Sequence, residues 1–138
     1  GQMFVDEKLC GGQIPFYQVD VESHITRLDE LAPDREMVIP QLTGCDLAML
    51  YNGKAMGCSI PSGSIVFLKK MTPEEIIPGL EYVIVCQKII TLRIVRTSER
   101  DSEWRLVAAV RENFDDFFVK ASDIEQVYQV VGKLEIKI

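Results

Sequence analysis

Short apolar runs separated by turn-forming residues dominate the hydrophobic pattern. Between residues 89 and 95, Ile90, Leu92 and Ile94 share one face and Arg93 projects from the other, as in a strand. Similar runs at residues 13–21, 45–51, 64–70, 81–87, 88–98 and 104–110 predict strands, and residues 117–138 predict one or two more. Weak helical spacing is confined to residues 22–35, where Pro33 ends any helix. This pattern predicts a mostly β domain.

A glycine-rich turn, GKAMGCSIPSGS from Gly53 to Ser64, connects two of the predicted strands. Gly53, Gly57 and Gly63 can take tight or left-handed conformations, so we expect a corner where the main chain closely approaches another segment. The turn is built like that of an active site. However, Ala55 stands where a nucleophile would be expected.

Length and composition indicate one compact domain, since the chain has 138 residues and is 47% hydrophobic. We expect residues 1–12 to be a linker or a tag-derived segment and residues 13–138 to form the domain. The four cysteines are widely spaced and His24 is the only histidine, so we expect no metal, no cofactor and reduced thiols in a cytoplasmic protein. No apolar run approaches the roughly 18 residues of a transmembrane helix, so no membrane association is expected.

The charge balance argues against direct nucleic-acid binding by this chain. Its formal net charge is −6 and its pI is near 4.8, whereas phosphate neutralisation needs clustered Lys and Arg. Several basic residues do fall on neighbouring predicted strands, and we interpret them as a solvated, salt-bridged face. They are Lys88, Arg93, Arg96, Arg100 and Arg105.

The glycine-rich turn resembles a motif of the C-terminal domains of LexA-like and phage-repressor-like regulators, which are self-cleaving serine peptidases. That motif is Gly-Asp-Ser-Met-x-Pro-x-Ile-x-x-Gly-Asp. Four positions match without a gap and four differ: the matches are Gly53, Met56, Ile60 and Gly63, and the differences are Lys54, Ala55, Cys58 and Ser64. The segments IPFYQVDVES, GLEYVIV, TLRIVR and WRLVAAVRENFDDFFV resemble further parts of the family in the same order. The resemblance spans about residues 13–138 and implies a bent, barrel-like β-sheet assembly of the LexA/signal-peptidase type.

The family's chemistry needs groups that this chain lacks. In the family, a buried neutral lysine removes the serine proton, and the serine attacks an Ala-Gly peptide in the domain's own linker. Carried over by position, the nucleophile falls on Ala55, the base on Arg93 and the scissile pair near Ser23 and His24. Alanine has no hydroxyl, and a guanidinium does not deprotonate in proteins. We therefore expect a peptidase-like domain that is not an enzyme.

Two alternatives remain open for the cleft, whose candidate lining residues are Gly53, Lys54, Met56 and Cys58. Cys58 or Ser59 could be a displaced nucleophile of a self-processing peptidase, although Lys54 is the only nearby group that could stabilise a thiolate. Alternatively, Lys54 and Arg93 could make the cleft cationic, so that it senses a peptide or an anionic ligand. Arg93 paired with a carboxylate of the domain is the simpler interpretation.

The resemblance implies a regulatory and dimerisation domain of a repressor-type transcription regulator. DNA binding would then lie in an N-terminal helix-turn-helix domain outside this chain. Two copies of the present domain would pair so that two such N-terminal domains bind two operator half-sites. Residues 127–138 alternate apolar and polar side chains, and we expect Leu134, Ile136 and Ile138 to form the dimer interface of an otherwise unpaired sheet edge. The same run could instead complete the domain's own sheet.

Overall fold

The computed structural model describes residues 13–136, which form one nine-stranded mixed sheet with short helical segments. The strands are β1 (Ile14–Asp20), β2 (Arg35–Met37), β3 (Leu47–Tyr51), β4 (Ser64–Met71), β5 (Glu81–Cys86), β6 (Ile89–Thr97), β7 (Glu103–Val107), β8 (Phe117–Lys120) and β9 (Ile124–Leu134). The helical segments are α2 (Val21–His24), η1 (Ile25–Glu30), η2 (Pro73–Glu75) and η3 (Ala121–Asp123). Across the sheet the order is β2-β1-β3-β4-β9-β5-β6-β7-β8, and only β1 and β3 are parallel neighbours.

The central strands bury side chains on both faces, which explains their nearly continuous apolar sequences. On β4, Val66 belongs to one core cluster and Phe67 to another on the opposite face. On β5, Val83 joins the same cluster as Val66, while Ile84 joins a third cluster with residues of β6, β7 and β9. The cluster that contains Val66 and Val83, here called the first cluster, also includes side chains of α2, β3 and β6 and so spans both halves of the sheet.

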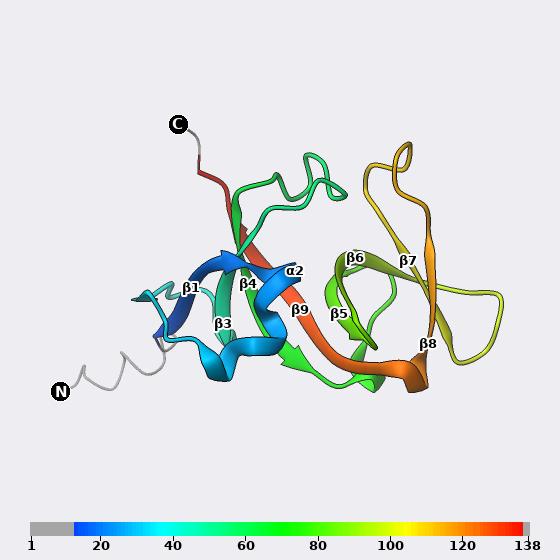
Figure 1. Ribbon diagram of the computed structural model, residues 1–138, viewed down its shortest axis with the longest axis horizontal. Coiled ribbons are helices and arrows are strands. Elements are labelled where there is room, and N and C mark those ends of the chain that lie inside the picture. Colours follow the sequence, from blue (N-terminus) through cyan, green and yellow to red (C-terminus); the bar gives the residue numbers. More distant parts are fainter. Residues whose placement is uncertain (1–12, 137–138) are drawn as a thin grey trace.

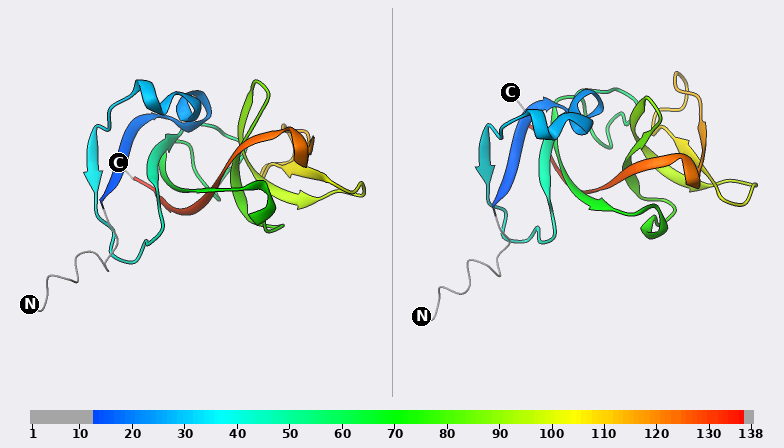
Figure 2. Two further views of the ribbon diagram at one scale, coloured as in Figure 1. Left: turned by 90° about the horizontal axis from the view of Figure 1, so that it is seen from below. Right: turned by 60° about the horizontal axis from the view of Figure 1, so that its bottom comes forward.

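Strand β9 lies in the middle of the sheet and joins its two halves. It pairs with β4 from Val127 to Leu134 and with β5 from Ile124 to Gln129. In Figure 1 it runs between β1, β3 and β4 on one side and β5 to β8 on the other, and Figure 2 shows its bend. The expectation that residues 127–138 form an unpaired edge is therefore wrong for residues 127–129, which are paired on both sides. The alternative, that the run completes the domain's own sheet, is confirmed for β9.

The mostly β prediction is confirmed, but the expected barrel-like closure is not. In the part of the chain that the structure describes, the sheet stays open because β2 and β8, at its two ends, each pair with one neighbour only. Its assignment to the LexA type remains a prediction. The predicted strands correspond to β1 and to β3 through β9, whereas β2 was not expected. The weak helical spacing of residues 22–35 corresponds to α2 and η1, which end before Pro33.

Two further expectations concern the membrane and the ends of the chain. Within residues 13–136, no helix has the length and apolar character needed to cross a membrane. The predicted linker at residues 1–12 and the dimer candidate Ile138 lie outside the described residues.

Candidate functional site

The turn between β3 and β4 is held close to two other segments, as its glycines predict. A Cβ at Gly53 would lie 2.7 Å from the hydroxyl oxygen of Tyr51. Gly57 has φ +54°, and a Cβ there would lie 2.5 Å from Cγ2 of Val110, in the loop between β7 and β8. The same loop is bonded to the turn, because the Val110 N–H donates to the Ala55 carbonyl at 3.0 Å. Side chains other than glycine therefore do not fit at these two positions without rearrangement.

The four predicted cleft residues do not share one environment. Met56 is fully buried in the first cluster, and Gly53 is half-buried against Tyr51. Lys54 and Cys58 are exposed. Ala55 itself is buried, so its methyl group packs into the fold.

Arg93 on β6 is a buried cation with several partners. Its side chain projects from the opposite face to Leu92, as the alternation predicts, and the residue is only 7% exposed. Nη1 donates to the Leu92 carbonyl at 2.9 Å and lies 3.7 Å from Oε2 of Glu22. The guanidinium also lies over the rings of Phe114 and Phe117, at 5.7 and 5.6 Å from their centroids. The prediction that Arg93 pairs with a carboxylate of the domain is confirmed.

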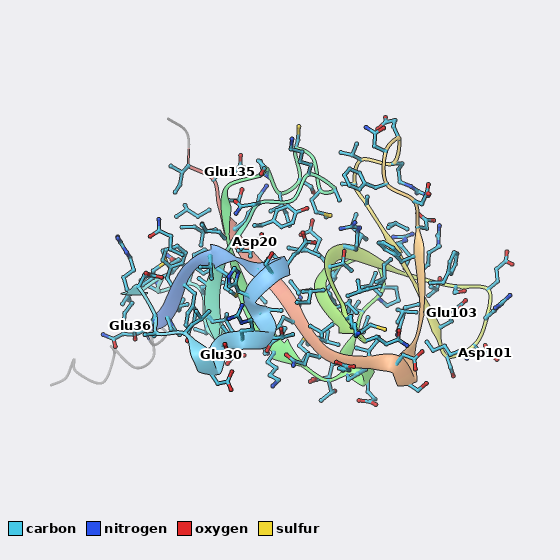
Figure 3. The ribbon with its side chains drawn as sticks, viewed as in Figure 1. Asp20, Glu30, Glu36, Asp101, Glu103 and Glu135 are labelled. Atoms are coloured by element: carbon cyan, nitrogen blue, oxygen red, sulfur yellow. The ribbon has the colours of Figure 1, made fainter. Side chains whose placement is uncertain are left out.

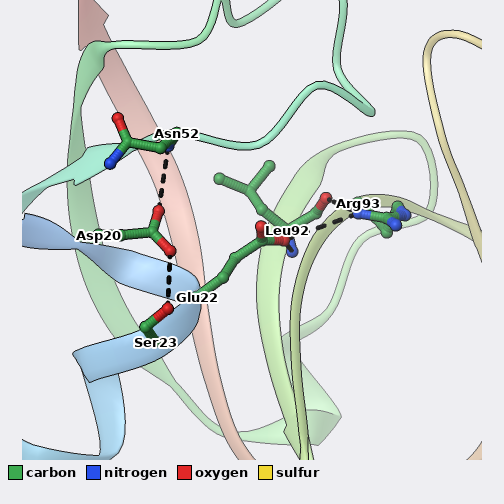
Figure 4. A network of polar contacts seen from close by, with 6 residues as sticks. All are labelled: Asp20, Glu22, Ser23, Asn52, Leu92 and Arg93. Atoms are coloured by element: carbon green, nitrogen blue, oxygen red, sulfur yellow. Dashed lines mark hydrogen bonds and ion pairs between the residues drawn. The ribbon is translucent and has the colours of Figure 1, made fainter.

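Glu22 brings α2 against β6 and supplies that carboxylate. Its Oε2 accepts a hydrogen bond of 2.8 Å from the Leu92 N–H, in addition to facing Arg93 (Figure 4). Burial raises the pKa of Glu22; the Leu92 N–H and the Arg93 charge oppose this shift, and the charge of Asp20 adds to it. The charge next to Arg93 is therefore an acid from α2, and Lys54 is exposed. A cleft made cationic by Lys54 and Arg93 together stays a prediction.

Asp20, at the end of β1, connects α2 to the glycine-rich turn. Its Oδ1 accepts a hydrogen bond from the Asn52 N–H at 3.0 Å, and its Oδ2 accepts one from the Ser23 hydroxyl at 3.0 Å (Figure 4). The ring Nδ1 of His24 lies 3.1 Å from the Asp20 carbonyl oxygen. Ser23 and His24, the positions of the family's scissile pair, thus lie in a helical turn and not in an extended strand that could cross a peptidase cleft.

Tyr51 is a buried side chain of the site that sequence reasoning missed. Its hydroxyl has no hydrogen-bond partner among the described residues, although backbone N–H groups of Met56 and Ala55 are close enough to act on it electrostatically. Burial raises the pKa of the Tyr51 phenol, the Glu22 charge raises it further, and those N–H groups and Arg93 lower it. Tyr51 therefore lies within the electrostatic reach of both Glu22 and Arg93. No local pattern marks it, because a buried tyrosine at the end of a strand is ordinary core.

The hydroxyls near the turn are engaged in ways that do not suit a displaced nucleophile. The Ser62 hydroxyl donates to the Asn52 carbonyl at 2.9 Å, and the Ser59 hydroxyl makes a long 3.4 Å contact with Oε2 of Glu81. The Lys133 ammonium donates to the Ser59 carbonyl and pairs with Glu135 at 3.3 Å. Among residues 13–136, no serine hydroxyl is hydrogen-bonded to a lysine amine.

No group of His, Cys, Asp and Glu side chains in the described part of the chain is placed to hold a metal ion.

Comparison with known proteins identifies no family for this chain. No protein-family model matches the sequence, and no curated protein matches it. Any inference about function therefore rests on the contacts of Arg93 and its neighbours.

The raised pKa of Glu22 predicts a specific pH dependence of stability. Because the pKa of Glu22 is raised above its ordinary value of 4.5, the folded state favours the protonated carboxyl. The contribution of Glu22 to stability is therefore fully present below pH 4.5 and is lost as the pH rises through the folded pKa. We expect Glu22→Gln, which does not titrate, to remove this loss. Urea unfolding between about pH 4 and 7 should show the stability of the wild type falling relative to that of the variant.

A matched control is Glu36→Gln, which changes an exposed carboxylate on the edge strand β2. Its stability should keep a constant offset from the wild type over the same pH range. Parallel curves for wild type and Glu22→Gln would show that burial of Glu22 is not coupled to folding.

Proposed function

We propose that this chain is a non-catalytic regulatory and dimerisation domain of a repressor-type transcription regulator, similar to LexA-like C-terminal domains. The observation that carries the proposal is the pairing of Arg93 with Glu22 at the position of the family's base. A guanidinium stays protonated and cannot accept the proton of a nucleophile. Its contacts with a carboxylate, a carbonyl and two aromatic rings are those of a side chain that stabilises the fold.

The position of the family's nucleophile supports the same proposal. The buried methyl group of Ala55 provides no attacking atom, and its carbonyl is occupied by the Val110 N–H. A self-processing peptidase would need Cys58 or Ser59 to replace it. Cys58 is exposed, and the Ser59 hydroxyl has only the long contact with Glu81, so neither has the buried base that the family's chemistry uses.

The net charge of this chain indicates that DNA binding and dimerisation would belong to different domains of the regulator. A chain with a net charge of −6 does not attract DNA phosphates, so DNA would be bound by a separate helix-turn-helix domain of the regulator. This chain would then supply the pairing of two copies. Leu134 and Ile136 are 43% and 61% exposed, and they lie at and just beyond the end of β9, where β5 no longer pairs with it. The same patch on two chains would form an isologous interface.

A second candidate function is the sensing of a peptide or an anionic ligand in the cleft. Three buried polar atoms have no partner among the described residues: the hydroxyl oxygens of Tyr51 and Ser64 and Nε of Arg93. The Tyr51 and Arg93 atoms are those that such a ligand would reach. An unpaired buried polar group is costly, so a bound polar group that reached both atoms would be favoured. This candidate needs only that the site opens, and it does not require catalysis.

Absence of self-cleavage is the first test. The protein held at alkaline pH for several days, alone or with a synthetic Ala-Gly linker peptide, should keep its intact mass in mass spectrometry, because no nucleophile faces a base. Cys58→Ser and Ser59→Ala are the matched variants. A cleavage product that one of these substitutions abolished would establish a displaced nucleophile and refute the non-catalytic assignment.

Dimerisation is the second test. Sedimentation velocity at tens of micromolar should show a dimer, and Leu134→Glu or Ile136→Glu should shift it to monomer without changing the circular dichroism, because a charge in an apolar interface is strongly disfavoured. Val38→Glu, at another exposed apolar position, is the matched control and should leave the dimer intact. A wild-type protein that stays monomeric at the highest concentrations would remove the dimerisation role.

A further inference from the structure

Strand β8 is an open edge of the sheet with exposed aromatic side chains. It pairs with β7 from Phe117 to Lys120 and, within residues 13–136, has no neighbour on its other side. An edge strand presents unpaired backbone N–H and C=O groups, to which another extended segment can bind. Phe118 is 59% exposed, and Phe117 is also exposed. Apolar side chains and unpaired backbone groups therefore occur together on this short strand.

A cavity of about 270 Å³ borders this strand. All four consecutive residues of β8 line it, and consecutive residues point to opposite faces, so the cavity follows the strand's edge and not one face alone. The opposite wall comes from the hairpin of β5 and β6, with Ile84, Cys86, Ile89 and Thr91. Ile89 is 51% exposed, so this wall also presents apolar surface to solvent.

The lining of the cavity carries more acidic than basic side chains. Among the described residues that line it, Glu103 and Asp123 are acidic and Lys120 is the one cation. The segment that carries β7 and β8, residues 99–125, contains eight acidic and four basic side chains, and two of its arginines, Arg105 and Arg111, share Asp116. Glu103 and Asp101 lie at this end of the molecule in Figure 3. Such a charge distribution attracts a cationic partner and disfavours an acidic one.

We propose that β8 binds an extended cationic peptide segment of another protein, which adds to the sheet as a further strand. Backbone hydrogen bonds to β8 would supply affinity. Because side chains alternate along a strand, apolar residues of the segment would enter the cavity between Phe117 and Ile89, and Lys or Arg residues would lie on the face that carries Glu103. Phe117 also contacts Arg93, so this site borders the surroundings of Arg93, but the proposal does not depend on the proposed function.

The first arm of the test uses synthetic probes and fluorescence anisotropy. The probe is fluorescein-labelled Lys-Val-Lys-Phe-Lys-Val, and its matched controls are Glu-Val-Glu-Phe-Glu-Val and the cationic peptide methylated on alternate backbone nitrogens. The cationic probe should bind at least tenfold more tightly than either control. The glutamate peptide carries the opposite charge, and the methylated peptide lacks backbone N–H donors. Equal binding of either control would overturn the proposal.

The second arm locates the site with a matched pair of isoleucines. Ile89→Ser should weaken binding of the cationic probe about tenfold, the effect of losing one buried apolar side chain, and Ile77→Ser, at a similarly exposed isoleucine, should not. Amides of residues 117–120 should be the ones that gain hydrogen-exchange protection from the probe, and circular dichroism checks that both variants fold. Equal effects of the two substitutions would overturn the proposal.

A second copy of this chain is the competing occupant, because residues 133–136 also alternate charged and apolar side chains. If a peptide Lys-Leu-Glu-Ile bound β8 more tightly than the cationic probe, and Ile89→Ser abolished self-association of the protein, the proposal of a foreign cationic segment would be wrong.

Discussion

The buried charge of Arg93 is the interaction around which the site is arranged. A guanidinium removed from water needs a counter-charge and hydrogen-bond acceptors, and three separate segments provide for it. Glu22 comes from α2, the carbonyl of Leu92 from β6 itself, and the rings of Phe114 and Phe117 from the loop before β8 and the start of that strand. These contacts hold α2 and this loop against β6, although Nε of Arg93 has no partner among the described residues.

The open, bent sheet places these segments together. Because β9 pairs with both β4 and β5, the half that carries the glycine-rich turn and the half that carries Arg93 share one strand. Met56 of the turn and Leu92 of β6 consequently pack in the same core cluster. The turn is also bonded to the loop between β7 and β8 through Ala55 and Val110, so the site lies where the two halves meet. The glycine-rich turn therefore contributes packing contacts between the two halves.

Sequence patterns predict the parts of this structure that depend on local periodicity. Alternation places Leu92 and Arg93 on opposite faces of β6, and the glycines of the turn predict the close approach found at Gly53 and Gly57. Strand β2 has no such pattern and forms by pairing with β1. The central position of β9 is also not encoded locally, because an alternating run looks the same at an edge as between two strands.

The candidate site could be predicted only in part, for the same reason. The family resemblance singles out Ala55 and Arg93, and the expectation of a carboxylate partner for Arg93 follows from the cost of a buried charge. Glu22 could not be identified, because it lies 70 residues from Leu92 in the chain and makes its contacts through tertiary structure alone. Tyr51 was missed because burial of its hydroxyl depends on the path of the turn above it.

A double-mutant cycle between Glu22 and Arg93 tests most directly whether this pair stabilises the fold. Urea unfolding at pH 7 of Glu22→Gln, Arg93→Met and the double variant should give a coupling free energy of about 1–3 kcal/mol, since breaking a buried pair leaves an uncompensated charge. The same cycle on the exposed pair Arg27 and Glu30 should give less than about 0.5 kcal/mol. Additive effects at Glu22 and Arg93, within about 0.5 kcal/mol, would contradict the structural role assigned to Arg93.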